Sequence, residues 1–262
     1  MASKKESTDV AAPASQSVTT GSWDQFAGQG QEGAEAGDYA IPYLTILQKL
    51  SPAIDEVEGA KAGQIMETAT NTLFNVDGSG ISVIPCYFRK DLVEWKPRES
   101  GGGLVKVHGW NIQVLETTVR NERGQQILPN GNILSDTKYH YVLVLADNGP
   151  IQAVMSMTST QLKKSRKWMS MMQMRKMRRP DGTTFTPPSF AYEYILGTIP
   201  EENEKGKWSG WTITQGPEII SRELVKEAIM FHRAIARGDV KMSDPDAELK
   251  AAAASMAEDI PF

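Results

Sequence analysis

The chain has 262 residues, of which 40% are hydrophobic and 23% are charged, and its formal net charge is −4. This size allows one medium domain with tails, or two small domains. The single cysteine, Cys86, excludes a disulfide framework and a zinc site built on cysteines. Residues 1–16 have no apolar leader-like segment, and no run reaches the roughly 18–20 apolar residues of a membrane span, so we expect a cytoplasmic protein.

The net charge hides an uneven distribution along the chain. Residues 1–85 carry 4 basic and 11 acidic side chains, residues 86–200 carry 16 and 9, and residues 201–262 carry 8 and 12. A basic centre between acidic ends indicates a surface for an anionic partner, which the overall charge alone would not predict.

Composition divides the chain into three parts. Residues 1–37 are rich in Ser, Thr, Gly, Gln and Ala and poor in aliphatic side chains, so we predict a disordered N-terminal arm. A folded domain is expected over 38–240, with an insertion at about 97–137. Residues 241–262 are predicted to form an acidic C-terminal tail, also disordered.

The folded part is predicted to be mainly β. Apolar alternation and β-rich composition predict strands over 81–95, 138–147, 151–157, 190–199 and 206–214. Helices are expected over about 159–179 and 218–237. The predicted order is therefore three strands, a helix and two strands. The OB-fold has the same order, because its helix falls between its third and fourth strands. We therefore expect an OB-fold-like barrel with an elaborated insertion and flanking helices.

The predicted helix at 159–179 carries the densest positive charge in the chain. At 3.6 residues per turn, Lys164, Lys167, Arg175 and Arg178 fall along one side, and Lys163 adjoins them. Such a strip suits a phosphate backbone, because each neutralised phosphate releases condensed counterions. The alternative interpretation is an ordinary solvated amphipathic helix.

Aromatic residues lie close to cations elsewhere in the basic centre. Binding of single strands needs cations for the backbone and rings for the exposed bases, at roughly 1–3 kcal/mol for each stacked base. We expect about half of the rings to be core instead, with the tryptophans the better candidates for stacking. The predicted nucleic-acid-binding residues outside the basic helix are Arg89, Trp95, Lys96, Arg98, Tyr139, Tyr141, Trp208 and Trp211.

Catalysis is the weaker interpretation. The three histidines, His108, His140 and His232, form no ligand-spaced pair, and Cys86 has no evident histidine partner in the sequence. No Gly-x-Ser-x-Gly nucleophile elbow is present, and the central carboxylates are scattered singly. We therefore predict no catalytic residues, no metal site and no cofactor.

The last four residues are Asp259-Ile260-Pro261-Phe262. Exposed Ile and Phe invite association, and the Phe262 ring and carboxylate suit an apolar pocket with a cation at its mouth. These residues resemble the acidic tip of bacterial and phage single-stranded-DNA-binding proteins, although only Glu258 and Asp259 stand adjacent where that family has a run of Asp. The alternative is a tail without function.

The resemblance implies a function. Proteins of that kind bind single-stranded DNA without strong sequence preference, protect it in replication, recombination and repair, and recruit partner proteins through the tip, with Phe262 as the anchor here. The chain is most similar to the divergent versions of tailed bacteriophages, which implies the host-cell cytoplasm. Two other functions stay open: an RNA-binding protein or nucleic-acid chaperone, and a non-catalytic adaptor whose basic helix binds an acidic protein. The oligomeric state also stays open.

Overall fold

A computed structural model of the chain describes residues 24–26, 29–34, 38–74, 80–203 and 206–242. The chain divides into two units, Met1–Glu35 and Ala36–Phe262. Within the first, the described residues include a 3₁₀ turn, η2, at Asp24–Phe26. The predicted acidic tail with its partner-binding tip lies outside the described residues, except that Lys241 and Met242 pair with Ala40 and Ile41 as a short strand and are not disordered. Most of the predicted N-terminal arm also lies outside the described residues.

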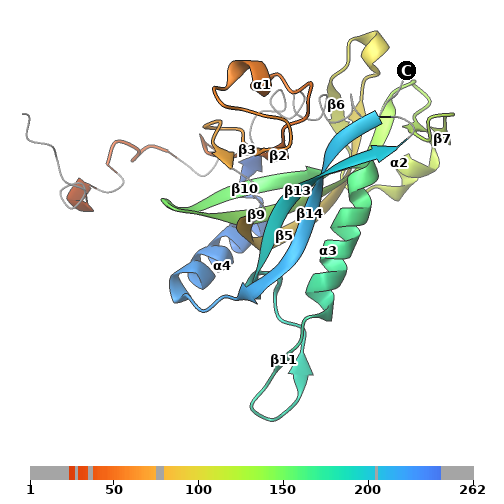
Figure 1. The fold of residues 1–262 in the computed structure, drawn as a ribbon. Coiled ribbons are helices and arrows are strands. Elements are labelled where there is room, and N and C mark those ends of the chain that lie inside the picture. The colour runs from red at the N-terminus through yellow and green to blue at the C-terminus, as the bar shows by residue number, and fades with distance from the viewer. Residues whose placement is uncertain (1–23, 27–28, 35–37, 75–79, 204–205, 243–262) are drawn as a thin grey trace, which may run out of the picture. The chain divides into compact units, whose positions relative to one another are not determined.

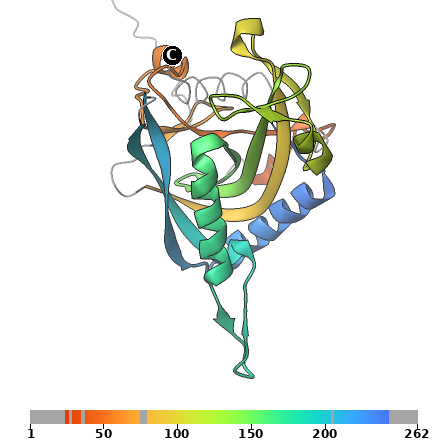
Figure 2. The same ribbon diagram turned by 90° about the vertical axis from the view of Figure 1, so that its right-hand side faces the viewer.

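The second unit is built on an eight-stranded sheet that curls into a half barrel (Figures 1 and 2). Its central pair is β5, Ile81–Trp95, and β9, Ile133–Ala146, which run antiparallel. β10, Gly149–Met157, turns back along β9. β13, Tyr192–Asn203, and β14, Gly206–Glu218, form a hairpin on the other side of β5. The prediction of a mainly β, OB-like fold is confirmed.

Shorter elements surround this sheet. Three small strands extend it: β6 at Leu104–Val107, β7 at Val119–Arg120 and β8 at Gln126–Ile127. The other strands are β1 at Ala40–Ile41, β2 at Leu44–Ile46, β3 at Ile65–Glu67, β4 at Leu73–Phe74, β11 at Met177–Arg178, β12 at Thr184–Phe185 and β15 at Lys241–Met242. The helices are α1 at Ala53–Glu56, α2 at Ile112–Glu116, α3 at Leu162–Met174 and α4 at Arg222–Arg237. Short 3₁₀ turns are η4 at Arg98–Ser100, η5 at Ser159–Gln161 and η6 at Ser189–Ala191.

Alternation along β9 fills a core on each face of the β5–β9 pair. Val142 and Val144 belong to the core that contains Trp168 of α3. Tyr141 and Leu143, between them in the sequence, belong to the core that contains Phe231 of α4. Because successive side chains of a strand point to opposite faces, the two helices cover opposite faces of the pair.

The basic helix is shorter than the sequence predicts. α3 ends at Met174, and Arg175 follows in an extended conformation with ψ 132°. The Arg175 guanidinium lies 4.1 Å from the ring centre of Tyr192 and donates to the carbonyl oxygen of Gly216 at 2.9 Å. Arg175 therefore contacts β13 and β14 at the point where the chain leaves the helix. The next residues form the β11–β12 hairpin in place of the predicted last helical turn.

A substitution at Gly80, next to the start of β5, can show how closely the backbones of β5 and β13 approach each other. Its φ is +72°, and a Cβ there would lie 2.5 Å from the backbone oxygen of Leu196. Gly80→Ala should therefore lower the free energy of unfolding by more than the about 1–2 kcal/mol that a left-handed conformation alone costs. Denaturant unfolding would measure it. The control is Gly124→Ala, at φ +80° with no atom within 4 Å; equal losses in the two variants would contradict a close approach at Gly80.

Candidate nucleic-acid interface

The inner side of α3 is fixed to the sheet by a buried polar and aromatic contact. The ring of His140 on β9 stacks on Trp168 with ring centres 4.6 Å apart, and its Nε2 lies 2.8 Å from the Ser165 hydroxyl oxygen. All three residues are buried. Burial lowers the pKa of His140 to about 3, so the imidazole is neutral at physiological pH. The opposite side of the helix therefore faces solvent.

That outer side is basic. Lys163, Arg166 and Lys167 are all exposed. From Thr158 to Arg179 the sequence contains no Asp or Glu, so the helix itself offers no carboxylate to pair with them. Over the 13 residues of α3, a length of about 20 Å, positive charge meets solvent without a local counter-charge.

The β11–β12 hairpin continues this charge beyond the helix. Figures 1 and 2 both show it projecting from the end of α3, away from the curled sheet. Asp181 closes its turn by accepting from the backbone N–H of Thr183 at 2.9 Å. The guanidinium of Arg179 lies 4.7 Å from the ring centre of Phe185, which keeps this cation against the hairpin.

We call the exposed cations of α3 and the hairpin the basic ridge. Within the part of the chain that the structure describes, none of them forms an ion pair. An uncompensated row of cations is suited to binding a polyanion. The residues of the basic ridge are Lys163, Arg166, Lys167, Lys176, Arg178 and Arg179.

The structure divides the predicted cations. Lys163, Lys167 and Arg178 lie on the basic ridge, whereas Lys164 turns to β13 and pairs with Glu201 at 2.6 Å. Arg175 is packed on Tyr192.

Three predicted cations lie on or beyond β5, outside the ridge. Arg89 bonds Asp91 at 2.8 Å and lies 5.2 Å from the ring centre of Tyr139. Lys96 and Arg98 are exposed in the turn that follows β5. Of the eight predicted cations, three are therefore exposed on the basic ridge and five lie elsewhere.

Four predicted stacking residues are core residues instead. Their exposed fractions are 8% for Trp95, 1% for Tyr139, 3% for Tyr141 and 4% for Trp211. The strands need large apolar side chains to fill the two faces of the curled sheet, and these rings supply them. Stacking of these rings on bases is incompatible with this structure. Trp208 is half-buried, and its Nε1 donates to Glu201 at 2.9 Å.

Sequence reasoning missed one aromatic residue at the surface. Trp110 is 36% exposed, between β6 and α2. The Nζ atoms of Lys90 and Lys138 lie 4.0 and 4.5 Å from the centre of its ring. Trp110 falls in the segment that the sequence marked only as an insertion, and no periodicity there indicated its position.

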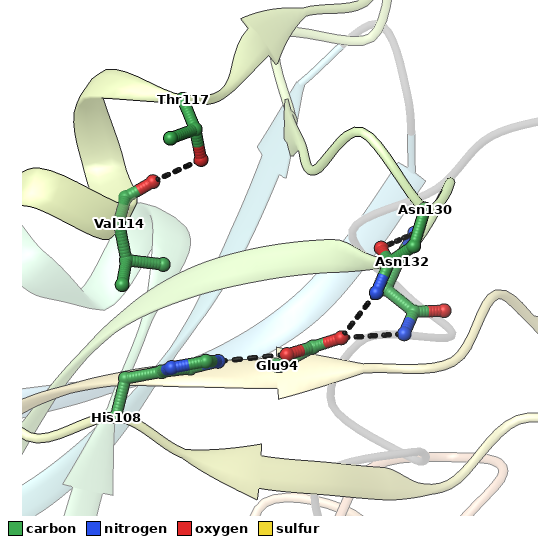
Figure 3. Close-up of polar contacts among 6 residues, drawn as sticks. All are labelled: Glu94, His108, Val114, Thr117, Asn130 and Asn132. Atoms are coloured by element: carbon green, nitrogen blue, oxygen red, sulfur yellow. Dashed lines mark hydrogen bonds and ion pairs between the residues drawn. The ribbon is translucent and has the colours of Figure 1, made fainter.

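Glu94 connects β5 to the segment that carries Trp110, and we call its contacts with His108, Asn130 and Asn132 the Glu94 clasp (Figure 3). Glu94 is 5% exposed, and its Oε2 lies 2.7 Å from Nε2 of His108. Its Oε1 accepts from the side-chain amides of Asn132 at 2.6 Å and Asn130 at 2.8 Å. These hydrogen bonds, that of Asn132 foremost, outweigh burial and hold the pKa of the Glu94 carboxyl below its usual range. One carboxylate thus joins β5 to two loops.

No group of three or more His, Cys, Asp or Glu side chains among the described residues could hold a metal ion. No helix in the described ranges is both long enough and apolar enough to cross a bilayer.

Comparison with known proteins places the chain in a family. The model of the Pam3 phage gp34-like protein family matches residues 11–241. The chain belongs to this family. No curated protein and no solved structure matches it. Membership supports the predicted similarity to phage proteins, whereas binding of single-stranded DNA and the role of the C-terminal tip stay predictions.

Glu94→Gln should weaken the clasp. A glutamine offers one acceptor oxygen, and its own NH₂ would face a donor, so we expect a loss of about 1–3 kcal/mol in the free energy of unfolding at pH 7. Denaturant unfolding would measure this. The matched control is Glu202→Gln, an exposed acid paired only with Lys207, where the loss should stay below about 1 kcal/mol.

The pH dependence gives a second check on the Glu94 clasp. A carboxyl whose folded pKa is lowered contributes stability above its unfolded pKa, and this stability is lost as the pH falls through the folded pKa. The difference between the wild type and Glu94→Gln should therefore shrink below the ordinary carboxyl pKa of 4.5. A difference that is constant from pH 7 to pH 3 would contradict an ionised Glu94 in the clasp.

Proposed function

We propose that the protein binds single-stranded DNA, without strong sequence preference, through the basic ridge. One observation carries the proposal: eight cations lie between Lys163 and Arg179 with no acidic side chain among them, and six of these cations are exposed. Each phosphate that the ridge contacts would release condensed counterions, which drives binding at low salt. Protection of exposed strands in the replication, recombination or repair of a phage genome would be the role.

The fold and the family support this proposal. OB-like barrels are a common scaffold for binding of single strands, and this half barrel carries the ridge on a helix docked to its sheet. The family is that of a phage protein. Phosphate contacts alone suit RNA or an acidic protein surface equally, so both alternatives are outcomes of the test below.

The test is a titration of the protein into a fluorescent oligo-dT strand across a salt series, with duplex DNA and RNA as competitors. The triple variant Lys163→Glu, Arg166→Glu, Lys167→Glu should bind much more weakly. Because the variant makes three fewer phosphate contacts, the magnitude of its slope of log affinity against log salt should also be smaller by about 2. Its matched control reverses Arg222, Lys226 and Arg233, the same change of charge on α4.

The outcomes separate the readings. Loss of binding in the α3 variant alone supports the basic ridge, and equal losses in both variants would reduce the effect to net charge. Stronger competition by RNA than by DNA would favour the RNA-binding alternative. Absence of oligonucleotide binding by the wild type at low salt would overturn the proposal and favour an adaptor for an acidic protein.

We propose further that the tip, Asp259 to Phe262, recruits partner proteins, and that the acidic tail competes with DNA for the basic ridge. Removal of residues 244–262 should then raise the affinity for oligo-dT and abolish the capture of replication proteins from infected host cells. Phe262→Ala keeps every acidic side chain, so it should abolish capture and leave the affinity unchanged. Unchanged affinity after the truncation would contradict the competition and leave recruitment standing.

A further inference from the structure

Trp110 combines the two components of a single-strand binding site. The residue is 36% exposed, and two ammonium groups lie over its ring, that of Lys90 at 4.0 Å and that of Lys138 at 4.5 Å from the ring centre. Lys138 is held in place by Asp136, whose Oδ1 lies 2.6 Å from Nζ. Lys90 is exposed and has no ion-pair partner in the described part of the chain.

This cluster lies on the face of the sheet that α3 covers. Lys90 is the cross-strand partner of Lys138, as Phe88 is of His140. Residues two apart along a strand share a face, so Lys138 lies on the side of His140, about 7 Å along β9 from it. His140 stacks on Trp168 of α3. The Trp110 cluster is therefore a neighbour of the helix that carries the basic ridge.

The backbone on either side of Trp110 is fixed by hydrogen bonds. The N–H of Leu92 donates to the carbonyl oxygen of Gly109, and the N–H of His108 donates to that of Leu92, both at 2.9 Å. Gly109 has φ +63°, a conformation that glycine adopts without strain, and it turns the chain into Trp110. The side chain of Asn111 then caps α2 by accepting from Gln113.

The Glu94 clasp adds a side-chain anchor. Through His108, Glu94 holds the residue two positions before Trp110, and it is itself fixed by two asparagine amides (Figure 3). A ring whose supporting backbone is fixed before the ligand arrives loses little freedom on binding. The geometry therefore describes a pre-organised ring and not a mobile surface side chain.

We infer that Trp110 is a base-stacking subsite, at which an unpaired nucleobase takes the place of the Lys90 ammonium over the indole and the displaced Lys90 pairs with an adjoining phosphate. The inference rests on the proposed function and deepens it, because phosphate contacts along the ridge do not require unpaired bases and stacking does. Single-strand selectivity would then come from Trp110, while the basic ridge supplies most of the sequence-independent attraction.

The test compares Trp110→Ala with the wild type on two probes, oligo-dT and an abasic strand with the same number of phosphates. Affinity for oligo-dT should fall about 5- to 150-fold, and affinity for the abasic strand should change little. The matched control is Ile112→Ala, which removes another exposed apolar side chain two residues away and should change neither affinity more than about twofold. Unfolding midpoints would confirm that each variant is folded.

Each outcome has one meaning. The subsite is supported if the wild type binds oligo-dT more tightly than the abasic strand, and if this preference is lost in Trp110→Ala and kept in Trp110→Phe. Equal weakening on both probes, or no weakening, would overturn it, and the proposed function would stand if the α3 variant still lost binding. If the wild type bound neither oligo-dT nor the abasic strand, both the subsite and the proposed function would be overturned. Trp110→Leu, which keeps apolar bulk and removes the ring, repeats the comparison if the alanine variant does not fold.

Discussion

The antiparallel pairing of β5 with β9 determines where the other elements of the domain can lie. The pair runs from Val83 opposite Val144 to Trp95 opposite Ile133, and at its centre it is buried on both faces. One face receives α3 through Trp168, and the other receives α4 through Phe231. The far end of the pair carries the loops that Glu94 clasps. The basic ridge and the Trp110 cluster therefore hold their places because one strand pair supports both.

The docking of α3 depends on a polar contact in a place where polar groups are costly. His140 and Ser165 are both 1% exposed, and each satisfies the other. A buried imidazole without a carboxylate partner is stable only in its neutral form, which explains the fall of the His140 pKa to about 3. The contact selects one position of the helix against β9, since a slip would leave both groups unpaired. The outward direction of Lys163, Arg166 and Lys167 follows from that position.

Some of this was predictable from the sequence, and the reasons are local. The alternation in 139–145 identifies β9, and the absence of acids in 158–179 identifies the basic segment, because both patterns lie within a few consecutive residues. The end of α3 at Met174 was not predictable, since Arg175 contacts Tyr192 and Gly216, which are distant in the sequence. A strand pattern also cannot say which face meets solvent when both faces are buried, so Tyr139 and Tyr141 were misplaced.

Trp110 is a surface residue whose position also could not be predicted from local sequence patterns. The position of Trp110 depends on Leu92 and Glu94, which belong to a different element, β5. The residues next to Trp110 in the sequence do not indicate this dependence. The clasp residues Asn130 and Asn132 enter from a third stretch of sequence. A site assembled from three segments has no contiguous motif, and only the register of β5 brings its parts together.

The charge on α3 works against the helix that carries it. Lys163 and Lys167 are four residues apart, and like charges at that spacing destabilise a helix by about 0.2–0.5 kcal/mol for each pair. The helix begins without a side-chain cap, and no acid relieves its first turn. Burial of Trp168 and the His140–Ser165 contact offset this cost from the inner side. Because this charge does not stabilise the helix, the arrangement supports the proposal that the basic ridge serves a ligand and not the fold.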